Sequence, residues 1–113
     1  MNSKLHEQCC RAPDSAAAPL TPAQADELLA QLGSQWQRDE QARSLRRTFD
    51  FADYRETLAF VNAVAWIAER QDHHPDLLVR YRDCTVTFTT HCVGGLSIND
   101  FICAARVGRL LDE

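Results

Sequence analysis

The sequence predicts a single α+β domain in which helices cover one face of an antiparallel sheet. Three observations predict this fold class. Capping residues precede segments whose apolar side chains recur every three or four positions, as in amphipathic helices. Other segments alternate apolar and polar residues, as in half-buried strands. These segments follow in the order helix, two strands, helix, two strands, helix, which is typical of hairpins packed against helices.

The N-terminal segment comes first and has no hydrophobic periodicity. Residues 1–20 include an Ala/Pro-rich run, so we expect a flexible tail before a domain at residues 21–113. His6, Cys9 and Cys10 in this tail are residue types that bind soft metals. Adjacent cysteines chelate one ion poorly, however, and a tetrahedral zinc site normally uses two well-spaced pairs. We therefore expect the tail to carry incidental thiols.

The first helix is expected to begin after Thr21, which forms a capping-box pattern with Gln24, and to end at Gly33. Two strands follow, one around Trp36 and one over residues 44–51. The second strand places alternate residues on one face, and these are Leu45, Arg47, Phe49 and Phe51.

A longer helix is expected over residues 53–70, where Asp53 and Glu56 form another cap signature. This helix carries two apolar stripes. The first contains Tyr54, Leu58, Val61, Ala65 and Ala68, and the second contains Phe60, Val64 and Ile67. One stripe is enough to cover a sheet, and the second would be exposed in a monomer. It is therefore covered either by a partner, such as another copy of the chain, or by the first helix.

A β-hairpin is expected next, from residues 77–81 and 84–90, around a turn at Arg82-Asp83. Ser97 then caps a last helix. The apolar residues of that helix are Ile98, Phe101, Ile102 and Ala105.

Composition and charge narrow the classes of function. The 113 residues are 45% hydrophobic and 25% charged, as in one globular domain. A net charge of −4 argues against nucleic acid, and Arg43, Arg46 and Arg47 have acidic neighbours and are expected on a solvated strand surface. No apolar stretch reaches the roughly 18 residues of a membrane span, and no secretory signal is visible. Five cysteines, an odd number, favour a reducing, cytoplasmic setting.

Three of the four histidines belong to the predicted hairpin or lie beside it. His73 and His74 end the long helix, because Pro75 disfavours the helical conformation of the residue before it. His91 ends the last strand. Since the hairpin leaves from His74 and returns to His91, we expect all three imidazoles at one rim of the sheet. Imidazole titrates near neutral pH, so such a cluster suits proton transfer to and from a bound substrate.

Two carboxylates are candidates to support the histidines. Glu69 lies one helical turn before His73, a spacing that brings side chains to one face. Asp100 lies three residues after Ser97, where a carboxylate also caps the helix. For each of them a purely structural role, as an exposed helix residue or as a cap, stays open beside the role in the site.

Other chemistries fit the same residues less well. A metal site is disfavoured because the side chains of adjacent His73 and His74 diverge and an HEXXH spacing is absent. Cys92 beside His91 has no second Cys/His pair. Cys84 and Cys103 follow strand and helix patterns and are expected in the core, which argues against a cysteine nucleophile.

Two motifs give the chain its resemblance to a known family. The helix-end signature of pterin-4a-carbinolamine dehydratases is similar to residues 68–75, AERQDHHP. Their second signature is similar to residues 90–100, THCVGGLSIND. The step of seventeen residues from His74 to His91 matches the usual spacing in that family. Together with Trp36 and its neighbouring strand and helix, the resemblance covers roughly residues 21–107.

The resemblance implies a four-stranded antiparallel sheet backed by helices, in homodimers or in homotetramers built from helix contacts. The implied reaction dehydrates 4a-hydroxytetrahydropterin to quinonoid dihydropterin. This reaction recycles the pterin of aromatic amino-acid hydroxylases, which makes such a hydroxylase a candidate partner. Pterin is the substrate, and the resemblance implies neither a cofactor nor a metal.

The resemblance also implies residue roles. His73 and His91 would act as acid and base, and His74 would bind and orient the pterin. The supporting residues would be Glu69, Pro75, Asp100 and Trp36. A second class of function stays open, because animal members of the family act as dimerisation partners of a homeodomain transcription factor. The alternatives are a non-catalytic dimerisation or regulatory module, or a role in molybdopterin metabolism, but the intact histidine trio favours catalysis.

Overall fold

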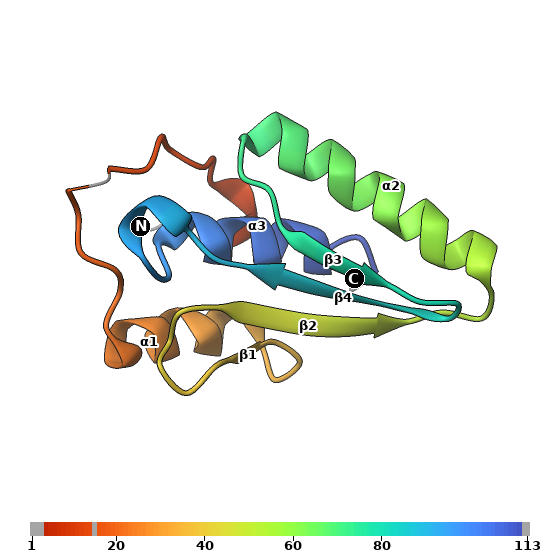
Figure 1. The fold of residues 1–113 in the computed structure, drawn as a ribbon, viewed down its shortest axis with the longest axis horizontal. Coiled ribbons are helices and arrows are strands. Elements are labelled where there is room, and N and C mark those ends of the chain that lie inside the picture. The colour runs from red at the N-terminus through yellow and green to blue at the C-terminus, as the bar shows by residue number, and fades with distance from the viewer. Residues whose placement is uncertain (1–3, 15, 112–113) are drawn as a thin grey trace.

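The elements follow the expected order of helix, two strands, helix, two strands and helix (Figure 1). The computed structural model describes residues 4–14 and 16–111. The helices are α1 (Pro22–Leu32), α2 (Tyr54–Gln71) and α3 (Ile98–Gly108), with two short 3₁₀ turns, η1 (Leu5–Glu7) and η2 (His91–Val93). The strands are β1 (Gln37–Arg38), β2 (Leu45–Asp50), β3 (Asp76–Val79) and β4 (Asp83–Phe88). The predicted α+β fold class is confirmed.

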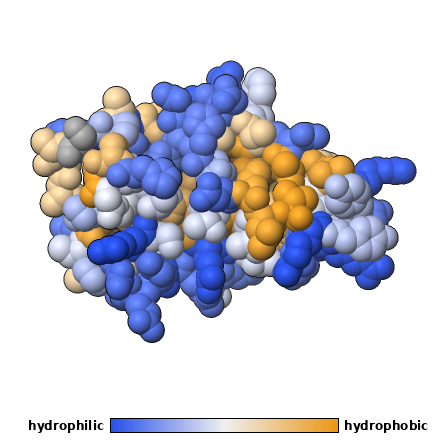
Figure 2. Space-filling view, viewed as in Figure 1, coloured by the Kyte–Doolittle hydropathy of each residue, from blue (hydrophilic) through white to orange (hydrophobic). Residues whose placement is uncertain are grey.

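The four strands form one antiparallel sheet in the order β1-β2-β4-β3. The central strand β4 aligns Val86 with Arg47 of β2 on one side and with Leu77 of β3 on the other. Burial alternates along β2 and β4, as the period of two predicts, so one face of each strand is buried. On the opposite face, the hydroxyls of Thr48 and Thr85 share a hydrogen bond of 2.7 Å. The face in Figure 2 is mostly polar, with its largest apolar patch right of centre. Leu78 of β3 is exposed.

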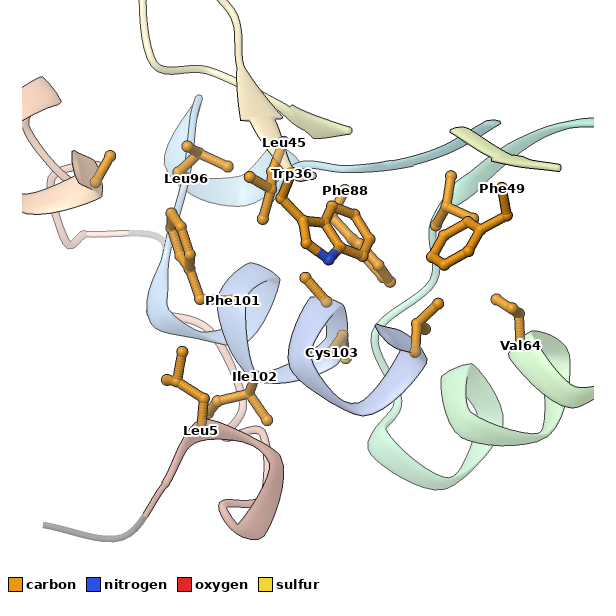
Figure 3. Close-up of a cluster of buried hydrophobic side chains, with 14 of the residues drawn as sticks. Leu5, Trp36, Leu45, Phe49, Val64, Phe88, Leu96, Phe101, Ile102 and Cys103 are labelled. Atoms are coloured by element: carbon orange, nitrogen blue, oxygen red, sulfur yellow. The ribbon is translucent and has the colours of Figure 1, made fainter. Parts of the chain in front are cut away.

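The buried face of the sheet packs against α2 and α3. Phe88 and Leu45 from the strands meet Phe101 of α3 in a cluster that also holds Trp36 and Val64 (Figure 3). Leu45 and Val64 are fully buried, so this cluster supplies much of the hydrophobic stabilisation of the domain. The end of β4 and the start of α3 are thereby fixed relative to each other.

Two local expectations from the sequence are corrected. Arg43 and Arg46 are exposed as expected, but Arg47 is buried, and its guanidinium carbon lies 4.1 Å from the centroid of the Phe49 ring. A cation–π contact therefore replaces part of its hydration. The hairpin turn lies at residues 80–82 rather than at 82–83. It does so because Asp83 pairs with Arg80 through a backbone bond of 2.8 Å and a side-chain bond of 2.8 Å.

The two stripes of α2 take the opposite roles from those expected. Phe60 and Val64 of the second stripe are buried, because Phe60 fits between Phe49 and Phe51 with ring centroids 4.5 and 5.1 Å away. The first stripe is the exposed one, with Tyr54 48% and Leu58 39% accessible, although Ala68 at its end is buried. Helix α1 does not cover the exposed stripe of α2, because it packs against α3 instead.

The N-terminal segment, for which a flexible tail was expected, contacts α3. We call residues 4–14 the N-terminal arm. Leu5 is buried beside Ile102 of α3 (Figure 3). Further along the arm, the backbone N–H of Arg11 donates to the Asn99 side chain at 3.0 Å, and the Asn99 amide donates to the Arg11 carbonyl at 2.6 Å. The arm therefore has defined partners near its start, at Leu5, and further along, at Arg11.

Within the described part of the chain, every helix is too short or too polar to cross a membrane.

Candidate functional site

The end of α2 directs two consecutive histidines in different directions. Asp72 adopts a left-handed conformation, with φ 51° and ψ 44°, that stops the helix. The next backbone N–H, that of His73, returns to the carbonyl of Ala68 at 3.2 Å. Pro75 then begins the extended segment that leads into β3. As a result, His73 is buried at 8% exposure while His74 is exposed.

His73 lies between a carboxylate and an aromatic ring. Its Nε2 is 2.6 Å from Oδ1 of Asp100, which is fully buried. Its imidazole stacks on Phe88 with a centroid separation of 5.9 Å and an interplanar angle of 8°. A buried, charge-assisted bond of this length is strong and directional. The orientation of the His73 ring is therefore fixed by α3 on one edge and by β4 on one face.

The second oxygen of Asp100 binds two further groups. Oδ2 accepts from the Thr90 hydroxyl at 2.7 Å and from the Ser97 backbone N–H at 2.9 Å. The bond from Ser97 is half of the capping box that starts α3, so the two roles open for Asp100 coincide. Sequence reasoning missed Thr90, and the signal that could have found it is its position directly before His91.

The surroundings of His73 favour its protonated form. Burial by itself lowers the pKa of the imidazole, but the hydrogen bond and the negative charge of Asp100 outweigh it, and the charges of Cys10 and Asp72 act in the same direction. The pKa of His73 is consequently raised above its usual value. The imidazolium form of His73 is thereby stabilised, in a ring whose orientation is fixed.

His74 has a partner of its own on the surface. Its Nε2 lies 2.9 Å from Oε1 of Glu69, one turn back on α2, and both side chains are exposed. An exposed pair of this kind contributes little to stability. It does orient the His74 ring, and it leaves that ring accessible to a ligand.

His91 begins η2 directly after Thr90 and is exposed. The loop that follows is closed by Thr90, whose backbone N–H donates to the carbonyl of Gly95 at 2.9 Å. Gly94 takes a positive φ of 72° in this turn, a conformation that favours glycine. The chain of bonds from His73 through Asp100 to Thr90 brings the backbone of His91 to the same rim. Among these three described histidines, no ring contact or hydrogen bond joins the His91 imidazole to the other two.

Trp36 belongs to the core rather than to the surface of this rim. It is buried, with its ring centroid 6.3 Å from that of Phe88 and 6.0 Å from that of Phe49 (Figure 3). Because Phe88 also carries the His73 ring, Trp36 supports the rim from behind. Pro75 is half-buried at the start of the strand.

Comparisons with known proteins agree with these motifs. The family model described as pterin 4 alpha carbinolamine dehydratase matches residues 18–110. A relative from Nitrosomonas eutropha is 49% identical over 107 residues, which are 95% of this chain and 93% of the relative. A relative from Xanthomonas oryzae pv. oryzae is 57% identical over 94 residues, or 83% of this chain and 79% of the relative. Both relatives are named, provisionally, as pterin-4-alpha-carbinolamine dehydratases.

Two solved structures share the fold. A transcriptional coactivator/pterin dehydratase from Brucella melitensis is 29% identical, with a TM-score of 0.77 over 83% of this chain and 99% of the other. A pterin dehydratase-like protein described as a RuBisCO assembly factor in the alpha-carboxysome is 24% identical, with a TM-score of 0.59 over 70% and 92% of the two chains. This second likeness concerns the fold alone. From the match of the family model and the two close relatives, the chain belongs to the pterin 4 alpha carbinolamine dehydratase family.

Proposed function

We propose that this chain is a pterin-4a-carbinolamine dehydratase, which converts 4a-hydroxytetrahydropterin into quinonoid dihydropterin and water. The observation that carries the proposal is the buried pair of His73 and Asp100. The exposed side chains of His74 and His91 belong to the same rim of the sheet. Family membership supports the substrate class. The histidines support the type of chemistry, because the reaction requires only that the protein donate and accept protons.

The proposed mechanism assigns each histidine a task. The N5 lone pair of the pterin forms the new C=N bond and expels the 4a-hydroxyl, which takes a proton from His73 and leaves as water. His91 accepts the proton that a ring nitrogen loses. The Nε2 of His73 is engaged by Asp100, so Nδ1 is the atom that would transfer the proton. The accessible ring of His74, held by Glu69, would bind and orient the pterin. The reaction transfers no electrons, so it needs no redox cofactor. Because the histidines can supply and accept the protons themselves, we also propose that no metal takes part.

The test generates the carbinolamine with an aromatic amino-acid hydroxylase and follows its decay by ultraviolet absorbance. Purified protein should accelerate the decay. Each acid–base group contributes about 10²–10⁴-fold, so the variant with both His73→Ala and His91→Ala should lose nearly all of the acceleration. His6→Ala, in the N-terminal arm, serves as the matched control and should keep the wild-type rate. An unchanged rate in the double variant would sink the assignment of acid and base.

We further propose that the reaction recycles pterin for an aromatic amino-acid hydroxylase in the cytoplasm. The odd number of cysteines, five, supports a reducing compartment. A hydroxylase gene beside the gene for this chain would favour pterin recycling, whereas neighbouring genes of molybdopterin metabolism would favour a role in that metabolism.

A protein-binding role is the second candidate. Exposed apolar side chains on α2, including Tyr54, Leu58 and Trp66, suit a protein partner better than water. The Brucella melitensis relative, 29% identical, is described as a transcriptional coactivator as well as a pterin dehydratase. The carbinolamine assay separates the two candidates, because a purely binding module would not change the rate of decay.

A further inference from the structure

Two cysteines meet where the N-terminal arm crosses α3. Cys10 of the arm and Cys103 of α3 have their sulfur atoms 3.4 Å apart. Cys103 is fully buried and Cys10 is half-buried, so a small solute reaches the pair only from the side of Cys10. The arm lies outside the residues that the family model matches, 18–110. Cys103 lies within those residues, and the proposed dehydratase mechanism uses neither thiol.

Hydrogen bonds hold the arm in position at this contact and directly after it. The backbone N–H of Cys10 donates to the side-chain oxygen of Gln71 at 2.8 Å. The next residue, Arg11, exchanges two hydrogen bonds with Asn99 of α3. These hydrogen bonds fix the position of Cys10 next to Cys103.

The two thiols differ in a way that suits oxidation. The hydrogen bond from Cys103 lowers the pKa of Cys10, and although burial opposes it, the charges of His73 and Arg106 act in the same direction. The same bond and burial raise the pKa of Cys103. Cys10 is therefore the thiol that ionises more readily, and the thiol of Cys103 beside it resists ionisation.

We propose that Cys10 and Cys103 are a site of reversible oxidation, where hydrogen peroxide converts the two thiols into a disulfide that fastens the N-terminal arm to α3. The Cys10 thiolate attacks one peroxide oxygen, the O–O bond breaks, and the leaving hydroxide takes up a proton as water. The thiol of Cys103 then attacks the resulting sulfenic acid, and the hydroxyl leaves as a second water with the thiol proton. Two sulfur atoms together lose two electrons, and the peroxide gains them.

The geometry needs only a small adjustment. Sulfur atoms in a disulfide are about 2.05 Å apart, so the pair must close by about 1.4 Å from its present distance. Cys10 lies in neither a helix nor a strand, so its backbone can shift by this amount while α3 stays in place. The Cys103 sulfur lies 4.0 Å from the carbonyl oxygen of His73, and Asp100 is one turn earlier on the same helix. The disulfide would therefore form beside the candidate site.

The test treats the reduced full-length protein with an equimolar amount of hydrogen peroxide at neutral pH, alkylates the remaining thiols and maps peptides by mass spectrometry. We expect one intramolecular link between Cys10 and Cys103, removed by dithiothreitol. Because the link closes a long loop, the midpoint of thermal unfolding should rise by at least about 5 °C on oxidation and fall back on reduction. Cys9→Ser is the matched control and should keep both effects, whereas Cys10→Ser should lose both.

Three outcomes would overturn the proposal. One is a Cys103 that stays fully alkylatable while Cys10 proceeds to sulfinic acid. Another is a link that uses Cys9 or Cys92 or joins two chains. The third is a Cys10→Ser variant with the same rise in the unfolding midpoint. Since none of these measurements uses a pterin, a failed dehydratase assay and a failed oxidation experiment remain distinguishable.

Discussion

Asp100 uses both of its oxygens, and each serves a different part of the molecule. Oδ1 binds the imidazole of His73, while Oδ2 binds the hydroxyl of Thr90 and the backbone of Ser97. A fully buried carboxylate is tolerated only when its lone pairs are satisfied in this way. One residue therefore caps α3, holds Thr90 directly before His91 and raises the pKa of His73.

The variant Asp100→Asn should weaken all three connections at once. The amide keeps one acceptor oxygen but loses the negative charge, so it cannot replace both carboxylate oxygens. We expect a loss of about 2–5 kcal/mol in the free energy of unfolding, measured in urea, and a fall of about 10²-fold or more in dehydratase rate. Asp76→Asn, at an exposed position, is the control. If Asp100→Asn is too unstable to purify, Thr90→Val keeps the charge and removes one bond. A pKa of His73 unaltered in Asp100→Asn, read by NMR, would contradict the role given to the carboxylate.

The raised pKa of His73 also predicts how stability depends on pH. The usual pKa of 6.5 applies to the unfolded chain, and the pKa in the folded chain is higher. Between these two values the folded state binds more protons, so the contribution of His73 is complete below the unfolded pKa and is lost as pH rises through the folded pKa. The free energy of unfolding should therefore fall as the pH rises from about 6.5 through the raised pKa of folded His73. In urea titrations this decline should shrink in His73→Gln and persist in His6→Ala.

At the scale of the elements, the starts of the helices could be predicted from the sequence, because residues close together in the chain determine them. The caps at Thr21, Asp53 and Ser97 begin the three helices as expected, because each cap needs only residues three positions apart. The roles of the two α2 stripes could not be predicted, because periodicity alone does not tell which of two apolar stripes faces the sheet. Phe60 decides it by its fit between Phe49 and Phe51.

The cap of α2 gives a prediction with a clear magnitude. The Asp53 carboxylate accepts from the backbone N–H of Glu56 at 2.8 Å. Asp53→Ala removes this bond at the far end of α2 from the histidines, so it should reduce the free energy of unfolding by about 1 kcal/mol. Asp76→Ala removes the same charge without removing a cap and should change stability less. Equal losses in the two variants, measured by thermal or urea unfolding, would rule out a specific capping effect.

At the scale of the whole molecule, the sheet and the helices that cover it were predictable from patterns along the chain. The meeting of His73, Asp100 and Thr90 was predictable only in part, because hairpin topology brings their segments together but does not choose their partners. The packing of the N-terminal arm was not predictable. Its anchors, such as Leu5 and Arg11, are scattered and have no period.

The exposed side chains of α2 lead to a prediction about assembly. Leu58 is 39% and Trp66 65% accessible, which is costly for a lone chain in water. If they form a contact between copies, Leu58→Glu combined with Trp66→Glu should lower the mass measured by size exclusion with light scattering. Arg55→Glu, also exposed on α2, is the control and should keep the wild-type mass. The same mass for the double variant would show that any oligomer uses another surface.

The flat contact between His73 and Phe88 has a consequence for the range of ligands. An imidazole that is clamped on its face and on one edge has lost its rotational freedom before any ligand arrives, so binding does not have to restrict it again. His74 and His91, both on the surface, keep adjustable side chains. We therefore expect tight discrimination around the atom that His73 meets and tolerance of different substituents elsewhere on the ligand.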